Sequence, residues 1–299
     1  MPKISAWLNA ARLRTLPLSI SGVLVGSALA GFYEKNNLLI FMLALFTTIG
    51  FQVTSNFAND YGDGVKGTDN AERIGPKRAL QSGLLTRSEL KKGIIFSIIA
   101  CLMLVAVLLT IAFGSENIGY FSLFMVLGLL SIWAAIRYTI GNSAYGYKGL
   151  GDVFVFIFFG FVGVLGSMFL YTNFLTVNAL LPAITIGCLS VGVLNLNNLR
   201  DYESDAKVKK NTLVVKIGFE NGKKYHYLLL VVGFLAMLFF SILCAVAWYH
   251  YIPMLAFIPI GMHLFKVYSN TSPGALDSEL KKLALSTFLL AVLFYITYN

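Results

Sequence analysis

The chain has 299 residues, of which 57% are hydrophobic and 12% are charged, and its formal net charge is +9. Soluble domains carry about 25% charged residues, so this composition excludes an ordinary soluble protein and indicates an integral membrane protein. The three cysteines all lie in apolar segments, with no disulfide or metal-binding pattern.

Nine apolar segments are candidate transmembrane helices, since a spanning helix needs about 20 predominantly apolar residues. Helices are expected because backbone polar groups in hydrocarbon must be satisfied within the segment. A more polar stretch, residues 3–13, precedes them and predicts an amphipathic helix at the membrane surface. The candidate spans are residues 16–33, 37–58, 93–113, 118–136, 152–171, 178–199, 227–249, 251–269 and 283–298. No polar linker divides them, so we expect one all-α domain over residues 1–299.

The basic residues are distributed unevenly between the two sides of the predicted bundle. All of the 23 Lys and Arg residues except Lys35 fall in the N-terminus or in the loops after the even-numbered spans. By the positive-inside rule, the N-terminus and these loops are cytoplasmic and the C-terminus is external. The same rule accounts for the basic charge without a nucleic-acid partner.

Two aspartate clusters follow the second and sixth spans. Residues 56–63 read Asn-Phe-Ala-Asn-Asp-Tyr-Gly-Asp, and residues 197–205 read Asn-Asn-Leu-Arg-Asp-Tyr-Glu-Ser-Asp. Each contains Asn-x-x-x-Asp-Tyr and a second Asp three or four residues after the first, a spacing that places both carboxylates on one face of a helix. A carboxylate deep in a bilayer costs roughly 2.5 kcal/mol or more, so two matching clusters predict a function. Their offset predicts a weak internal repeat in which the second and sixth spans are equivalent.

Two such faces opposed across a cavity are suited to Mg²⁺, which prefers hard oxygen ligands, and through Mg²⁺ to a diphosphate. The predicted catalytic and metal-binding carboxylates are Asp60, Asp63, Asp201 and Asp205. One turn before the first Asp of each cluster, Asn56 and Asn197 add amide oxygens as ligands. Lys and Arg suit the outer oxygens of a diphosphate. The predicted diphosphate-binding residues are Lys66, Arg78, Lys210, Arg14 and Arg137.

These motifs resemble those of the UbiA superfamily of intramembrane prenyltransferases. Several stretches are similar to the branch that prenylates 1,4-dihydroxy-2-naphthoate, and together they cover nearly the whole chain. They include residues 12–17, 59–69, 73–76, 81–83, 145–152 and 198–201. Three features depart from the superfamily pattern. Asp69 follows Asp63 by six residues where four are usual, Ala144 stands where proline is frequent, and Lys209 stands where glycine is frequent.

The resemblance implies a nine-helix bundle around a central cavity, embedded in membrane lipid and located in the bacterial plasma membrane. It also implies Mg²⁺-dependent transfer of a long polyprenyl group from a prenyl diphosphate to 1,4-dihydroxy-2-naphthoate, with loss of CO₂ to give a demethylmenaquinol. The loop after the fourth span is the candidate acceptor site, because it offers hydroxyl, cationic and carboxylate groups. Its candidate residues are Tyr145, Tyr147, Lys148 and Asp152.

Two alternatives remain open at this stage. One is prenylation of another aromatic acceptor, such as 4-hydroxybenzoate or homogentisate. The other is an ion transporter whose intramembrane acids form an ion path. Prenyl chain length, oligomeric state, the identity of a general base and the role of Asp69 do not follow from these motifs.

Overall fold

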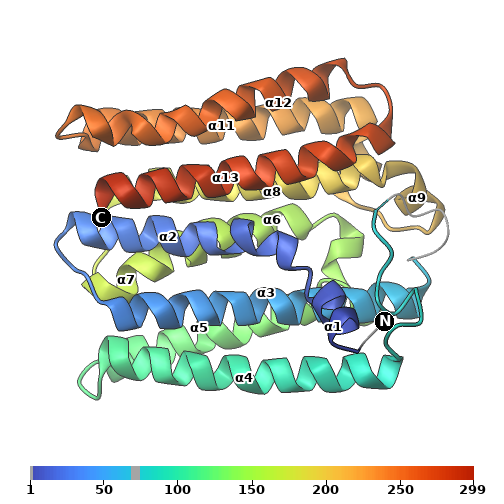
Figure 1. Ribbon diagram of the computed structural model, residues 1–299, viewed down its shortest axis with the longest axis horizontal. Helices are drawn as coiled ribbons and strands as arrows, with labels where there is room; N and C mark the ends of the chain where they lie inside the picture. Colours follow the sequence, from blue (N-terminus) through green and yellow to red (C-terminus); the bar gives the residue numbers. More distant parts are fainter. Residues whose placement is uncertain (1–2, 69–74) are drawn as a thin grey trace.

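The computed structural model describes residues 3–68 and 75–299, and these residues form helices and connecting loops without a strand (Figure 1). The α-helices are α1 (Lys3–Ala11), α2 (Leu16–Phe32), α3 (Leu38–Lys66), α4 (Arg87–Phe113), α5 (Ile118–Arg137), α6 (Gly151–Val155), α7 (Ser167–Thr172), α8 (Leu180–Arg200), α9 (Tyr202–Lys207), α10 (Leu213–Ile217), α11 (Phe219–Cys244), α12 (Phe257–Ser269) and α13 (Asp277–Tyr298). Short 3₁₀ turns cover Leu13–Thr15, Tyr145–Lys148, Val177–Ala179, Trp248–Ala256 and Pro273–Leu276.

Nine helical stretches in the described part of the chain are long and apolar enough to cross a membrane, which confirms the predicted all-α, nine-span architecture. They are Lys3–Phe32, Leu38–Lys66, Arg87–Phe113, Ile118–Arg137, Gly151–Thr172, Val177–Arg200, Phe219–Cys244, Trp248–Ser269 and Pro273–Tyr298. The two termini lie at opposite ends of the bundle (Figure 1). We refer to the end that carries α1 and α9 as the α9 end, and to the other as the opposite end.

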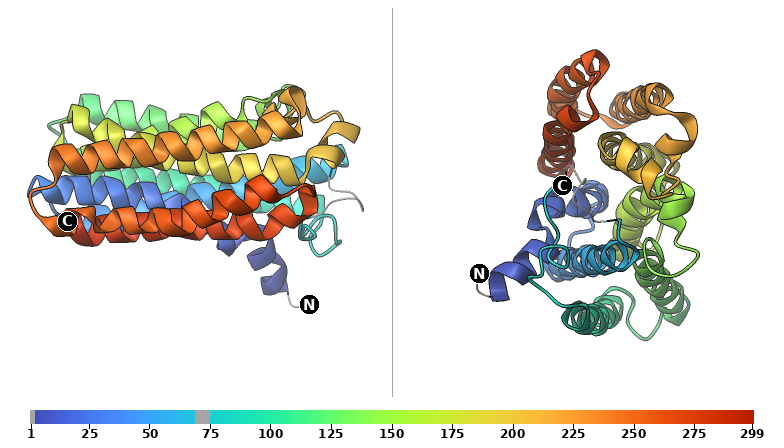
Figure 2. Two further views of the ribbon diagram at one scale, coloured as in Figure 1. Left: turned by 90° about the horizontal axis from the view of Figure 1, so that it is seen from above. Right: turned by 90° about the vertical axis from the view of Figure 1, so that its right-hand side faces the viewer.

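Helix α8 is central to one half of the bundle, where it packs against α11, α13 and the fifth span. Its buried side chains, including Ile186, Leu189 and Leu196, contribute to the largest apolar cluster of the protein. In the other half, α3 packs against α4 and α5, and α2 packs against α13 (Figure 2). The end-on view shows the helices surrounding a central region, so side chains from several spans can meet there.

Glycines allow two spans to approach each other closely. Helix α2 packs against the fifth span, whose middle part, Phe156–Gly166, is a wide π-helix. A Cβ at Gly26 would lie 2.3 Å from the carbonyl oxygen of Val164, and one at Gly22 would lie 2.9 Å from that of Phe159. Small residues therefore bring the backbones of these helices together, as is common in membrane bundles.

Several boundaries differ from those predicted. Asn37 caps the start of α3 by accepting hydrogen bonds from two backbone N–H groups, and the helix then continues to Lys66 rather than ending near residue 58. The first aspartate cluster is therefore helical and not the start of a loop. The ninth span begins at Pro273 rather than at residue 283, so it is a full-length crossing.

The predicted N-terminal helix forms as α1, and it packs on the bundle. The rings of Trp7 and Phe57 meet edge to face with centroids 5.3 Å apart, and Ala6 and Ala10 are buried.

At the far side of the molecule, a chain of polar side chains joins α11, α12 and α13. His226 Nε2 lies 3.0 Å from His263 Nε2, and His263 Nδ1 lies 2.8 Å from Glu279 Oε2. Such polar contacts hold helices together where lipid provides no hydrophobic drive.

Candidate active site

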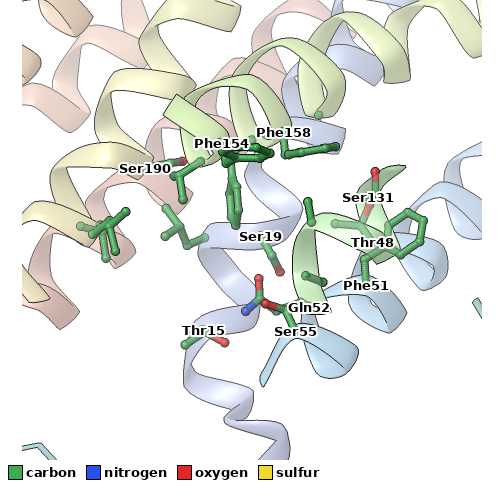
Figure 3. Close-up of a pocket in the computed structure, with 18 of the residues that line it drawn as sticks. Thr15, Ser19, Thr48, Phe51, Gln52, Ser55, Ser131, Phe154, Phe158 and Ser190 are labelled. Carbon is green, nitrogen blue, oxygen red and sulfur yellow. The ribbon is translucent and has the colours of Figure 1, made fainter. Parts of the chain in front are cut away.

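A cavity of about 800 Å³ lies within the bundle, enclosed by α2, α3, α4, α5, the fifth span, α8 and α13. Its deeper part is mostly apolar and aromatic, with Phe51, Phe154 and Phe158 facing the space between the helices (Figure 3). Hydroxyl and amide groups also line the cavity, among them Ser19 of α2 and Gln52 and Ser55 of α3. The cavity therefore suits a molecule with a long apolar part.

The cavity becomes strongly charged at the α9 end. Asp63 of α3 and Asp201 after α8 both line it. Seven cations line the same end: Arg12, Arg14, Arg78, Arg200, Lys210, Lys281 and Lys282. Carboxylates beside an excess of cations suit an anionic group that is bound partly through metal ions.

In the first cluster, Asn59 and Asp63 stand one helical turn apart on α3, and both line the cavity. The predicted residues Asn56 and Asp60 stand on a neighbouring face, and the structure gives them other contacts. The carboxylate of Asp60 accepts hydrogen bonds from the backbone N–H groups of Ala79 (3.1 Å) and Leu80 (3.4 Å). Asp60 thus anchors the loop before α4, and Asn59, which the sequence did not single out, lines the cavity beside Asp63.

Asn56 supports the corner between α1 and α2. Its amide donates to the carbonyl of Ala11 at 2.8 Å and to Thr15 Oγ1 at 3.1 Å. Between these two partners, Arg12 adopts a left-handed backbone conformation (φ 50°), and its side chain lines the cavity. A non-glycine residue in this region costs roughly 1–3 kcal/mol, a strain that often marks functional sites. Arg12 is therefore a further cation of the site that the motif analysis did not select.

In the second cluster, Asn197 and Asp201 repeat the spacing of Asn59 and Asp63, and both line the cavity. The guanidinium of Arg200, which is 4% exposed, donates to both carboxylate oxygens of Asp201 at 2.8 and 2.7 Å. It also donates to Asn197 Oδ1 at 2.9 Å. Arg200 is further bound at 2.6 Å to Asp277 of α13, and so fixes the second cluster against the last helix.

Asp205 and Lys210 form a buried ion pair next to this cluster, with Lys210 Nζ 3.2 Å from Asp205 Oδ1. Burial raises the pKa of Asp205 to about 6, the cation of Lys210 opposes this rise, and the negative charges of Asp201 and Asp63 add to it. Asp63 and Asp201 line the same cavity, so the two clusters face one space. Asp205 is not part of the cavity lining, and its Oδ2 is buried without a hydrogen-bond partner.

The predicted acceptor loop divides into two parts. The hydroxyl of Tyr147 donates to Asp63 Oδ1 at 2.8 Å, and Lys66 Nζ lies 3.9 Å from the centre of the Tyr147 ring. Tyr145 lines the cavity, where its ring stacks on Phe154 with centroids 3.9 Å apart and its hydroxyl donates to a backbone carbonyl. Tyr147 thus supports a candidate metal ligand, and Tyr145 forms part of the aromatic wall.

Other predicted residues lie outside the cavity lining. The side chain of Lys148 is exposed, and its carbonyl accepts a hydrogen bond from Lys216. Asp152 is buried and bonded to the hydroxyl of Tyr225 of α11. Arg137 lies at the end of α5, beside Gly141. These positions place Lys148, Asp152 and Arg137 away from the cavity surface, whereas Arg14, Arg78 and Lys210 line it. Asp69 lies outside the described residues.

The oxygen-rich side chains fit Mg²⁺. Within the part of the chain that the structure describes, no three His, Cys, Asp or Glu side chains converge on one metal position. Mg²⁺ does not require such a cage, because it retains waters and is usually held by one or two carboxylates together with substrate phosphates. Asn59 and Asp63 on α3, with Asn197 and Asp201 of the second cluster, match that requirement, and Arg200 already donates to the second pair.

Comparison with known sequences now defines the family. Residues 19–292 match the UbiA prenyltransferase family. The chain belongs to this family. It is 43% identical over 294 residues to the 1,4-dihydroxy-2-naphthoate octaprenyltransferase of Haemophilus influenzae, covering 98% of this chain and 95% of that one. It is also 43% identical to the enzyme of the same name from Escherichia coli, over 80% of this chain and 77% of that one.

Solved structures share the fold of this UbiA prenyltransferase. A UbiA homolog from Archaeoglobus fulgidus bound to DMAPP and Mg²⁺ superposes with a TM-score of 0.67 at 15% sequence identity, covering 98% of both chains. The same homolog bound to Cd²⁺ gives a TM-score of 0.68 at 14% identity. The resemblance found in the sequence is therefore confirmed at the levels of family and fold.

Proposed function

We propose that this prenyltransferase moves a long polyprenyl group from a prenyl diphosphate to 1,4-dihydroxy-2-naphthoate, in a Mg²⁺-dependent reaction that releases CO₂ and forms a demethylmenaquinol. The observation that carries the proposal is one cavity with a charged end, built from two Asn/Asp pairs and seven cations, and a long apolar interior. This distribution matches a diphosphate head and a prenyl tail. The acceptor is inferred from the names of the similar enzymes.

The charged end would bind the diphosphate. Asn59, Asp63, Asn197 and Asp201 would hold Mg²⁺, which, when bound, supplies Lewis-acid neutralisation of the leaving diphosphate. Cations from the cavity lining would bind the outer phosphate oxygens that the metal does not reach. They include Arg12, Arg14, Arg78 and Lys210.

The reaction then follows from bond polarity. The C–O bond between the allylic carbon and the diphosphate breaks, and its electron pair leaves on the diphosphate. The electron-rich ring forms a new C–C bond to the allylic carbon at the position that carries the carboxylate. The bond to that carboxylate breaks, CO₂ departs and the electron pair returns to the ring, so this route requires no dedicated base.

The interior protects the allylic centre from water. Positive charge develops on the allylic carbon as the C–O bond lengthens, and water would capture it. The stacked rings of Tyr145 and Phe154 line the cavity and present π-faces that stabilise positive charge. An apolar, aromatic interior therefore favours transfer to the ring over hydrolysis.

We also place the protein in the bacterial plasma membrane with the N-terminus and the α9 end in the cytoplasm and the C-terminus outside, because the basic residues cluster at the α9 end. A charged prenyl diphosphate would then meet the charged end of the cavity from the side on which the loops are longest.

The test is an acceptor panel. Purified protein in detergent receives a prenyl diphosphate and Mg²⁺ with 1,4-dihydroxy-2-naphthoate, 4-hydroxybenzoate or homogentisate, and product is separated by chromatography. Product with the naphthoate supports the proposal. Product with another acceptor alone overturns the choice of acceptor and retains prenyl transfer. The absence of product with all three overturns prenyl transfer itself.

A further inference from the structure

Among the residues that the structure describes, one cation of the cavity lining has no partner. Lys210 Nζ is bound to Asp205, and Lys282 Nζ lies 2.5 Å from Glu279 Oε1. Lys281 lines the same cavity and is exposed, but no hydrogen bond or ion pair reaches it from the described part of the chain. The ammonium group of Lys281 is therefore free to bind an anionic group in the cavity.

Lys281 lies farther from the α9 end than the second aspartate cluster does. Asp277, one helical turn earlier on α13, also lines the cavity and accepts a hydrogen bond from Arg200 at 2.6 Å, and Arg200 in turn binds Asp201. These contacts fix the start of α13 at the level of the candidate metal site. The next helical turn places Lys281 about 6 Å deeper along the bundle. This level lies between the diphosphate site and the apolar interior, where an acceptor must meet the allylic carbon.

A second group without a partner faces the cavity from α8. Ser190 lines the cavity and is 1% exposed, and its Oγ is buried without a hydrogen-bond partner (Figure 3). Helices α8 and α13 run in opposite directions, and a Cβ at Gly192 would lie 3.2 Å from Leu283 Cδ2, which aligns the two helices. By this alignment, Ser190 and Lys281 are about 6 Å apart along the bundle axis. A buried hydroxyl in this position is suited to a hydrogen bond with a ligand in the cavity.

We propose that Lys281 and Ser190 bind the aromatic acceptor, Lys281 through a carboxylate and Ser190 through a hydroxyl group. The inference rests on the proposed function, in which the acceptor is 1,4-dihydroxy-2-naphthoate. Its carboxylate and its 4-hydroxyl group are separated on one ring, so a single molecule can reach both side chains. The stacked rings of Tyr145 and Phe154 line the same cavity and offer an apolar surface to the bicyclic ring. Lys281 thus selects an acceptor with a carboxylate, and Ser190 selects one with a second hydroxyl group.

Lys281→Met and Ser190→Ala test the two contacts separately. Steady-state kinetics gives the KM of each substrate, and 1-hydroxy-2-naphthoate and 1-naphthol serve as competitive inhibitors with and without the carboxylate. Lys281→Met raises the KM for 1,4-dihydroxy-2-naphthoate and the inhibition constant of 1-hydroxy-2-naphthoate about tenfold, because each ligand loses a charge-assisted hydrogen bond. The inhibition constant of 1-naphthol and the KM for prenyl diphosphate stay unchanged. Ser190→Ala raises the KM for the dihydroxy acceptor about threefold or more and leaves both inhibition constants unchanged, because the inhibitors lack the 4-hydroxyl group.

Lys224→Met is the charge-matched control, because Lys224 is an exposed lysine of α11 outside the cavity lining. It leaves the KM for both substrates unchanged. If Lys281→Met instead raises the KM for prenyl diphosphate, Lys281 belongs to the diphosphate site. If Lys281→Met and Ser190→Ala both change the KM for the naphthoate by less than about twofold, the acceptor assignment is wrong.

The outcomes also separate this inference from the proposed function. If wild-type protein transfers no prenyl group to the naphthoate, the proposed function fails. Direct binding of 1-hydroxy-2-naphthoate to wild type and to Lys281→Met, measured by the fluorescence of the ligand, then still decides the carboxylate contact. Equal affinity of the two proteins would overturn it. Thermal unfolding shows whether each variant is folded, and Lys281→Gln replaces Lys281→Met should that variant not fold.

Discussion

The hydrogen bond from Tyr147 to Asp63 offers a test of how the candidate site is built. Replacing Tyr147 with phenylalanine removes the hydroxyl that donates to Asp63 Oδ1 at 2.8 Å and that also lies 2.9 Å from Thr68 Oγ1. The aromatic ring remains, so its contact with the ammonium of Lys66 is kept. The variant therefore removes the donor to Asp63, together with the contact to Thr68, and leaves the ring in place.

The magnitude follows from the kind of bond that is lost. A hydrogen bond to a charged group contributes about 1.5–3 kcal/mol. Tyr147 is half-buried near the charged end, where water partly replaces the lost donor, so the lower end of this range applies. Since about 1.4 kcal/mol corresponds to tenfold, we expect kcat to fall about tenfold through poorer orientation of Asp63.

Steady-state kinetics distinguishes this role from direct contact with the acceptor. If Tyr147 orients Asp63, kcat falls and the KM for the naphthoate acceptor stays unchanged. If Tyr147 binds the acceptor, as the sequence predicted, that KM rises and kcat is little affected. Tyr227→Phe, on α11 and outside the cavity lining, serves as the control. A Tyr147→Phe enzyme with wild-type kcat would refute the positioning role.

Asp63→Asn and Asp201→Asn each reduce turnover by about a hundredfold or more in a prenyl-transfer assay. Asp60→Asn chiefly weakens the anchoring of the loop before α4, so denaturation shows a free energy of unfolding lower by about 1–2 kcal/mol. Equal loss of turnover in all three variants would contradict the assignment of helix faces. Gly26→Ala lowers the melting temperature, because the new Cβ would lie 2.3 Å from a backbone carbonyl oxygen and the two helices must move apart at a cost of about 1–3 kcal/mol. An unchanged melting temperature would show that the two helices are not in close contact there. Lys209→Gly preserves activity and does not lower stability. Lys209 has a left-handed backbone with φ 56°, and glycine removes the conformational penalty of about 1–2 kcal/mol that other residues have there. A clear loss of stability would show that the lysine side chain itself stabilises the protein.

The sequence was sufficient to predict the spans and the general location of the site, because both depend on local properties. Runs of apolar residues specify membrane helices whatever their neighbours are. The carboxylates of Asp63 and Asp201 stand out because charge is rare in such segments. The glycine preference at position 209, seen as a family resemblance, has a local cause as well, because the backbone there is left-handed.

The face of α3 that meets the cavity could not be predicted from the sequence. The pairs Asn56/Asp60 and Asn59/Asp63 have the same spacing, and a shift of three residues rotates a side chain by only about 60° around a helix. Asn56 bonds to the end of α1 and Asp60 bonds to the loop before α4, so Asn59 and Asp63 are the pair that faces the cavity. The same limit applies to Tyr147, whose partner Asp63 is distant in the chain.

We propose that the two aspartate clusters act through Mg²⁺ to transfer a prenyl group to the naphthoate. A metal titration tests this requirement for Mg²⁺. Purified protein would be stripped with EDTA, supplied with prenyl diphosphate and 1,4-dihydroxy-2-naphthoate, and titrated with Mg²⁺ while prenylated product and CO₂ are both measured. We expect no product without metal, recovery as Mg²⁺ is added, and one CO₂ for each product molecule. Full activity in EDTA, or prenylated product formed without CO₂, would contradict it.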